Sequence, residues 1–244
     1  MVGYVFQETA IRRASLTNDN SVFQFDLVED GIGVLAPKSI AQTIGKIFFL
    51  SQDGFYEFDG QSFRRIGKGR VDETFLADVA QGSITEMWAT IDPQDSAVYW
   101  FYTSVSANST YADKVLIYNY AFDRWSTAEM DISVAFSATP LGFTLEGLDA
   151  AFPEYDMDTL PWSLDDRIFQ GTLPALAAFG SDDKLSFFNG TTLEATVETA
   201  TAQPMPGRRS FIQGVSPVYE GDTTAITASV GVKDRSAGGF SYGG

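Results

Sequence analysis

Carboxylates are the side chains of this sequence best suited to acid–base chemistry, because the 244 residues include no His and no Cys. His is the usual proton-transfer group near neutral pH and the commonest transition-metal ligand. Without it and without Cys, no Ser-His-Asp or Cys-His arrangement can form. Enzymes without His do exist, notably those in which a carboxylate pair hydrolyses glycosidic bonds. With 32 Asp and Glu residues, some suitable pair arises by chance, so the sequence favours no catalytic residues.

The acids are unevenly distributed and gather between residues 146 and 166. The acidic side chains of this segment are Glu146, Asp149, Glu154, Asp156, Asp158, Asp165 and Asp166. Their oxygen atoms are the ligand type that Ca²⁺ prefers, but no EF-hand or repeat spacing relates them. We therefore expect no metal site and no cofactor. The segment is interpreted as a solvated acidic loop, with a repulsive surface facing a channel or a neighbouring subunit as the functional alternative.

The formal net charge of −16 restricts the partners of the chain. Binding to nucleic acid depends on neutralising phosphates with Lys and Arg, so stable binding to DNA is not expected. Anionic membranes are disfavoured for the same reason. No run of eighteen apolar residues predicts a transmembrane helix, so no membrane insertion is expected.

The clearest structural signals are two Asp-Gly pairs, Asp53–Gly54 and Asp59–Gly60, on either side of the apolar run 55–58. Asp-Gly between apolar runs favours the positive φ angles of tight hairpins, so residues 47–66 predict a three-stranded meander. The segment 51–55 is similar to the Asp-box turn of sialidase-type propellers, although its Gly comes one residue early and Trp is missing. We interpret it as a hairpin turn. A short helix is predicted over 71–79.

A common unit recurs along the chain: an apolar strand that ends in an aromatic residue, followed by Asp or Asn. The units are Phe58–Asp59, Tyr118–Asn119 and Phe188–Asn189 (with Gly190 next), and Phe25–Asp26 is a weaker fourth. The aromatic ring anchors the strand end in the core, and the Asx side chain accepts hydrogen bonds from turn amides. Such units bury their faces by stacking on one another, as propeller blades do.

These patterns predict an all-β fold of propeller-like meander blades, in the form of an incomplete propeller with a small additional β sheet. Residues 1–200 are assigned to the propeller-like domain, with loop insertions near 103–113 and 139–166. Residues 201–244 are assigned to additional strands or to the start of a further domain. A generic meander sandwich is the alternative. The mid-strand start and the Gly-Gly finish suggest a piece of a longer protein.

Three double-Arg pairs lie at expected strand edges or loops: Arg12–Arg13, Arg64–Arg65 and Arg208–Arg209. Since side chains alternate along a strand, only one Arg of each pair faces a given side. These residues are candidates for contacts with acids across a subunit boundary, where Arg is the favoured cation. Ordinary surface charge is the alternative.

Several segments, in this order, resemble the hub or nozzle proteins of short-tailed bacteriophages, often called packaged-DNA stabilisation proteins. The resemblance runs from about residue 4 to 235 and depends on the order of segments that are individually weak. These segments are Phe6–Arg13, Gly33–Ser39, Phe48–Gly60, Ile66–Gly67, Arg70–Asp72, Ile91–Pro93, Tyr118–Asn119, Arg124–Ser126, Leu164–Asp165, Phe169–Gly171 and Pro206–Arg209.

The resemblance implies a structural virion protein rather than an enzyme, and it brings no catalytic residues with it. Copies would form a homo-oligomeric ring, with six-fold symmetry expected, in the phage tail after assembly in the bacterial host cytoplasm. The ring would dock on the tail adaptor and hold spike, fibre or needle proteins. Viral DNA would pass through its channel without specific binding, which an acidic wall would favour.

Two other functions stay open at this point. The first is a carbohydrate-binding or receptor-binding propeller whose exposed aromatic residues stack on sugars. Its candidates are Trp88, Trp100, Trp125 and Trp162. The second is a carboxylate-based glycan hydrolase.

Overall fold

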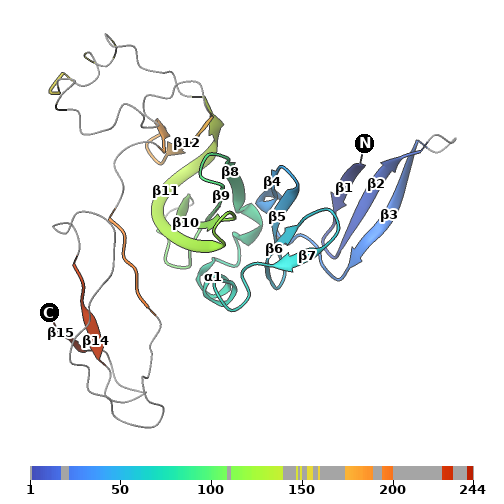
Figure 1. Ribbon diagram of the computed structural model, residues 1–244, viewed down its shortest axis with the longest axis horizontal. Helices are drawn as coiled ribbons and strands as arrows, with labels where there is room; N and C mark the ends of the chain where they lie inside the picture. Colours follow the sequence, from blue (N-terminus) through green and yellow to red (C-terminus); the bar gives the residue numbers. More distant parts are fainter. Residues whose placement is uncertain are drawn as a thin grey trace. The chain divides into compact units, whose positions relative to one another are not determined.

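The computed structural model describes residues 2–17, 22–108, 111–139, 174–188, 194–199, 227–232 and 241–243, together with 147, 149, 153–155 and 159. The chain divides into two units, Met1–Thr192 and Leu193–Gly244. The described part is an all-β protein of antiparallel meander sheets, as the sequence predicts (Figure 1). In the second unit, β14 (Val230–Val232) pairs antiparallel with β15 (Ser241–Gly243).

The first sheet is a three-stranded meander of β1 (Val2–Phe6), β2 (Ala10–Leu16) and β3 (Phe23–Asp30). Here one sequence prediction is wrong. Asp26 lies inside β3, opposite Arg13, and is not in a turn. Phe25 does not anchor a strand end, because 56% of its surface is exposed.

The second sheet contains the predicted meander with one strand more than expected. Its strands follow the order β4 (Ala41–Thr43), β5 (Lys46–Ser51), β6 (Gly54–Phe58) and β7 (Phe63–Arg65). The Asp-Gly turns provide the positive φ that each reversal needs, +132° at Gly54 and +92° at Gly60. The hairpin interpretation of both turns is confirmed.

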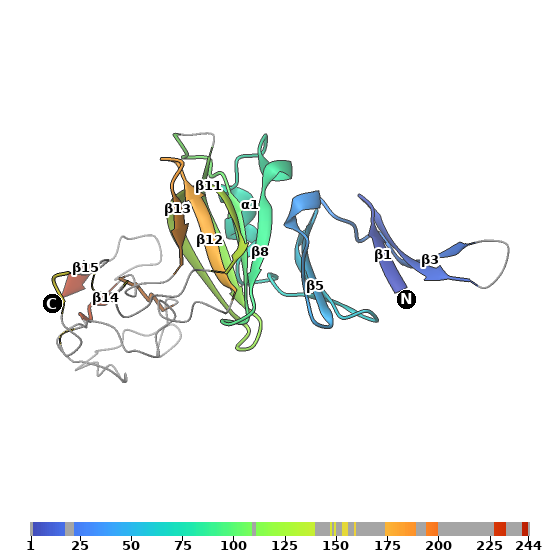
Figure 2. The same cartoon turned by 90° about the horizontal axis from the view of Figure 1, so that it is seen from above.

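The third sheet has six strands that follow chain order: β8 (Trp88–Asp92), β9 (Ala97–Tyr102), β10 (Ala112–Asn119), β11 (Arg124–Ala138), β12 (Ala175–Gly180) and β13 (Leu185–Phe187). The long strand β11 curves strongly, so the sheet curls into a half-barrel (Figure 1). Figure 2 shows the strands β13, β12, β11 and β8 of this sheet from above. The strands before the third aromatic–Asx pair, Phe188–Asn189, thus extend the same sheet that contains the second pair, Tyr118–Asn119. The third pair does not belong to a separate blade.

Helices are short, as predicted. The helix α1 (Asp72–Asp78) lies within the expected segment 71–79 and buries Phe75. Two 3-10 turns, η1 (Pro37–Ser39) and η2 (Ile84–Glu86), precede β4 and β8. The expected insertion at 103–113 connects β9 with β10, and the one at 139–166 connects β11 with β12.

The second sheet is buried on both faces, and this explains its unbroken apolar sequence. One face of β5 and β6 presents Phe48 and Phe55 to a core that includes Trp100 of β9 and Tyr118 of β10. The alternate residues of the same strands form a second core against the first sheet, where Tyr4 meets Phe58 edge-on at 4.9 Å. The three sheets therefore contact one another in chain order, first to second and second to third.

The third core fills the inside of the curl. It is formed by residues from β9 to β12, with Phe101 and Val115 from the flat part and Ile132 and Leu176 from the curved part. Phe188, the aromatic residue of the third predicted unit, packs half-buried against this core. Asn189 and Gly190 lie outside the described residues.

Candidate functional site

The predicted Asx turns have the expected geometry. The Oδ1 atom of Asp59 accepts hydrogen bonds from the backbone amides of Gln61 at 2.8 Å and Ser62 at 2.7 Å. These amides hold the pKa of Asp59 below its usual value, because they favour its charged form. The aromatic partner Phe58 is fully buried, so the predicted anchoring is confirmed for this unit.

The second unit repeats this arrangement at the turn between β10 and β11. The Oδ1 atom of Asn119 accepts hydrogen bonds from the amides of Ala121 at 3.1 Å and Phe122 at 2.9 Å. Its Nδ2 donates to the carbonyl of Asp95 in the neighbouring turn at 2.9 Å. Tyr118 is fully buried before it. The turn between β8 and β9 uses the same device without an aromatic residue, since Asp92 accepts from the amide of Gln94 at 2.8 Å.

A buried carboxylate that the sequence did not reveal lies beside the first Asp-Gly turn. Asp72, at the start of α1, is 4% exposed and accepts a hydrogen bond from the Phe55 amide at 3.1 Å. Its other oxygen lies 3.3 Å from Arg65 Nη2. Arg65 also contacts Asp53 at 3.0 Å, so one guanidinium joins the turn to the helix. A Cβ atom at Gly54 would overlap the Asp72 carboxylate, which explains the absence of a side chain there.

Arg64, on the opposite face of β7, links the second sheet to the third. It contacts the buried Glu57 at 2.6 Å and donates to the Tyr118 hydroxyl at 3.0 Å. The Tyr118 hydroxyl in turn donates to Asp123 at 2.8 Å. Burial, together with the Asp123 carboxylate, raises the pKa of Tyr118 to about 12. Lys46 completes the neutralisation of Glu57 at 2.9 Å.

A similar polar cluster closes the far end of the β9–β10 pair. Lys114 contacts the Asp78 carboxylate at 2.9 Å, and the Tyr102 hydroxyl donates to the same carboxylate at 2.9 Å. Burial and this carboxylate raise the pKa of Tyr102 above its usual value. The hydrogen bond to Asp78 also raises the pKa of Lys114. These charged side chains are occupied by contacts that position α1 against the third sheet.

The predicted interface arginines have partners within the chain where the structure describes them. Arg13 lies 3.3 Å from Asp26 on the neighbouring strand. Arg12, on the opposite face, donates to the Gln7 side chain at 3.1 Å, and within the described part of the chain no carboxylate pairs with it. Arg64 and Arg65 hold Glu57, Asp53 and Asp72 as described above. Arg208 and Arg209 lie outside the described residues.

The structure describes only part of the predicted acidic segment. Asp149 and Glu154 are exposed. Glu146, Asp156, Asp158, Asp165 and Asp166 lie outside the described residues. Among the residues that the structure does describe, no group of three or more acids could hold a metal ion. No helix among the described residues of the chain is long and apolar enough to cross a membrane.

The tryptophans divide into structural and accessible residues. Trp100 is fully buried and donates from Nε1 to the carbonyl of Ser39 at 2.9 Å, so its proposed role as an exposed sugar platform is wrong. Trp125 is half-buried and donates to the carbonyl of Ile66 at 3.1 Å. Trp162 lies outside the described residues. Trp88 is the remaining candidate.

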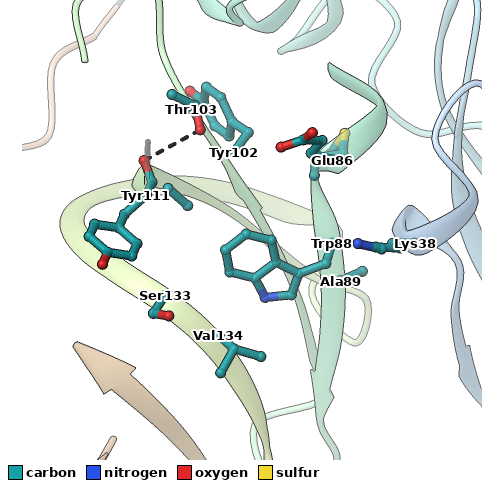
Figure 3. Close-up of a pocket in the computed structure, with 11 residues that line it drawn as sticks. Lys38, Glu86, Trp88, Ala89, Tyr102, Thr103, Tyr111, Ser133 and Val134 are labelled. Atoms are coloured by element: carbon teal, nitrogen blue, oxygen red, sulfur yellow. Dashed lines mark hydrogen bonds between the residues drawn. The ribbon is translucent and has the colours of Figure 1, made fainter. Parts of the chain in front are cut away.

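Trp88 borders a cavity of about 560 Å³ that is lined by residues of β8 and β11 (Figure 3). One face of the indole stacks on Phe101, with ring centroids 5.5 Å apart. The cavity is also lined by Tyr111 and Thr103, and the Thr103 hydroxyl donates to the Tyr111 carbonyl at 3.3 Å. Glu86 is the one carboxylate among its described lining residues. Aromatic surface with scattered hydroxyls suits a small polar ligand, whereas a two-carboxylate hydrolase would need a second acid.

Comparisons with known proteins add no family, since neither a scan against protein-family models nor a search of the curated proteins found a match.

Proposed function

We propose that this chain is a structural, non-enzymatic subunit of a bacteriophage tail nozzle or hub. Copies form a ring, with six-fold symmetry expected, around a channel through which viral DNA passes without specific binding. The ring docks on the tail adaptor and carries spike, fibre or needle proteins below. This places the protein in the virion tail, after assembly in the host cytoplasm.

The observation that carries this proposal is the structural use of the segments on which the phage resemblance rests. Residues 48–60 form the β5–β6 hairpin and its turns, in the sheet that is buried on both faces. Within another segment, Arg70 lies 2.9 Å from Asp123, and Asp72 binds the Phe55 amide. The hairpin builds the contacts between sheets, and Arg70 and Asp72 hold α1 and the segment before it against the β10–β11 turn and β6, as expected for a protein that acts by its shape and assembly.

The charge supports a channel that releases DNA. The chain carries a net charge of −16, and several of its cations are paired within the structure. A surface of this kind repels phosphate and becomes less repulsive as salt screens it. We infer that part of the acidic segment 146–166 faces the channel or a neighbouring subunit.

Electron microscopy of the purified chain, alone and mixed with the tail adaptor of the same phage, tests the proposal. Closed rings that attach to the adaptor are expected, together with no retention of duplex DNA in a gel at low salt. Particles that stay monomeric with the adaptor present, or that bind duplex DNA tightly, would contradict it.

A carbohydrate-binding or receptor-binding module is the second candidate, and the Trp88 cavity is the observation that favours it. If it is correct, glycan-array binding by the wild type is lost in Trp88→Ala. Trp125→Ala is the matched control, because Trp125 is half-buried at a sheet contact and does not line the cavity. Equal glycan signals from both variants, or none from the wild type, would exclude this function for the cavity.

A further inference from the structure

The first sheet has an apolar face that nothing in the described chain covers. Side chains alternate across a strand, and paired residues share a face. The strand pairing therefore places five large apolar residues on one side. They are Val5, Leu16, Phe23, Phe25 and Leu27, with exposed fractions of 40%, 58%, 55%, 56% and 53%. We call this set the outer face.

The opposite side of the same sheet is already in use. Tyr4, Phe6 and Ile11 lie there and pack into the core shared with the second sheet. The outer face thus has the same residue types as a sheet face that is buried against another sheet, but no described part of the chain packs against it. From the exposed fractions, its apolar area is on the order of 450 Å², within the range of about 300–600 Å² of the largest apolar patch on a typical monomer, which is often functional.

A second, different apolar patch lies on the third sheet. Phe179 of β12 is 36% exposed and its ring lies 5.8 Å from that of Phe136 on β11. Leu185 pairs with Phe179 from β13 and is 48% exposed, and Phe187 shares this face half-buried. These four residues point away from the core inside the curl, because their neighbours Ala178 and Leu176 point into it. We call this set the convex patch.

The net charges beside the two surfaces are opposite: Arg12 lies in the outer face, whereas acids outnumber the one cation beside the convex patch in the described chain, Lys184, which contacts Asp182 at 3.1 Å. Arg12 pairs with both Val5 and Leu27 in the register of the outer face, and in the described part of the chain no carboxylate pairs with it. Near the convex patch, exposed Asp131 precedes Ile132, whose partner Gly180 follows Phe179. Exposed Asp183 lies in the turn before Leu185. Arg12 donates to the neutral Gln7 side chain, so the outer face keeps a positive charge and is complementary to an apolar patch bordered by acids.

We propose that the outer face of one copy binds the convex patch of the next copy, head to tail. Contacts between two different surfaces close into rings or grow into filaments, whereas a contact of the outer face with itself would stop at a dimer and bring two Arg12 side chains together. The convex patch adds about 200 Å² of apolar area to the roughly 450 Å² of the outer face. Because apolar atoms make up about 57% of a typical interface, a contact that covers both surfaces would bury roughly 1,100 Å² in all. This exceeds the ~1,000 Å² expected of a biological interface.

This inference rests on the ring assembly proposed above and names the surfaces that form it. Its test uses two variants of the full chain, Phe25→Asp on the outer face and Leu185→Asp on the convex patch. The control is Ile44→Asp, because Ile44 is fully exposed in the β4–β5 turn and the change adds the same charge away from both surfaces. Circular dichroism and thermal melting check that each variant folds as the wild type does.

Light scattering after size-exclusion chromatography gives the mass of each sample. The wild type and Ile44→Asp are expected as oligomers, and each of the other two variants alone as a monomer. An equal mixture of Phe25→Asp and Leu185→Asp has one intact pair of surfaces, so it is expected to give a heterodimer of twice the 26.6 kDa chain mass and no larger species.

The possible failures separate the two proposals. Phe25→Asp rings like those of the wild type would overturn the head-to-tail contact and leave the ring subunit intact. Dimers of Leu185→Asp alone, with no heterodimer in the mixture, would show that the outer face binds itself and would also overturn the inference. A monomeric wild type would contradict the ring assembly as well. Head-to-tail oligomers that do not bind the tail adaptor would contradict only the proposed nozzle function.

Discussion

Replacing Asp72 by Ala should destabilise the fold more than any other single removal of a charge in the described structure. Asp72 is 4% exposed, and its carboxylate satisfies the buried Phe55 amide and holds Arg65. An orphaned buried amide costs about 1–3 kcal/mol. Breaking a buried ion pair costs about 3–5 kcal/mol. The cost is smaller here, because Arg65 would still contact the Asp53 carboxylate and its side chain is partly exposed to solvent.

Together these terms predict a loss of about 3–4 kcal/mol in the free energy of unfolding, a large part of the 5–15 kcal/mol that keeps a typical domain folded. Asp72→Asn keeps an acceptor for the Phe55 amide and should lose about half as much. Urea denaturation followed by tryptophan fluorescence measures both values, with an unchanged slope against urea showing that the same transition is compared.

The matched control is Glu73→Ala, which removes an acid from the same helix at an exposed position. It should change the free energy of unfolding by no more than about 0.5 kcal/mol. A loss below about 1 kcal/mol for Asp72→Ala, or one equal to that of Glu73→Ala, would refute the idea that this carboxylate joins the turn to the helix.

Three further predictions follow from the sheets and turns. Asn119→Ala removes the acceptor of two turn amides and should cost about 1–2 kcal/mol in urea denaturation, while Asn119→Asp, which keeps that acceptor, should cost less. Trp100→Ala empties the fully buried core between the second and third sheets and should cost about 3–5 kcal/mol, whereas Phe122→Ala, at a residue 76% exposed, should be nearly neutral in the same assay. In the folded state the pKa values of Asp59 and Asp123 are lowered from 3.8, so the stability that their charged forms contribute is present above pH 3.8 and is lost as the pH falls through the lowered values. Asp59→Asn should therefore make the urea midpoint depend less on pH in the acid range. An unchanged pH dependence would contradict the assignment.

Local signals in the sequence predicted the parts of the fold that depend on neighbouring residues. Asp59 and Asn119 accept hydrogen bonds from amides two and three residues further along the chain, so their role depends only on residues close in the sequence. The same holds for the Asp-Gly hairpins, whose backbone angles depend on the two residues themselves. Asp26 has the same local pattern but lies in a strand, because pairing with Arg13 on β2 extends through it.

The parts that sequence reasoning missed depend on long-range contacts. The amide that Asp72 satisfies lies 17 residues earlier, and Arg64 meets Tyr118 across 54 residues. Nothing near Asp72 in the sequence distinguishes it from Glu73, the exposed acid next to it in the same helix. The close contact of Gly54 with its carboxylate is likewise visible only in three dimensions. Trp100 is fully buried and Trp88 lines a cavity, and this difference depends on contacts with distant strands.

The most direct test of the central claim is a cryo-electron-microscopy reconstruction of tail particles that contain this chain. The account predicts a closed, six-fold ring of copies below the adaptor, with part of the acidic segment 146–166 facing the channel or a neighbouring subunit. A chain that is absent from the ring, or one whose whole acidic segment lies on the outer, solvent-facing wall, would contradict it.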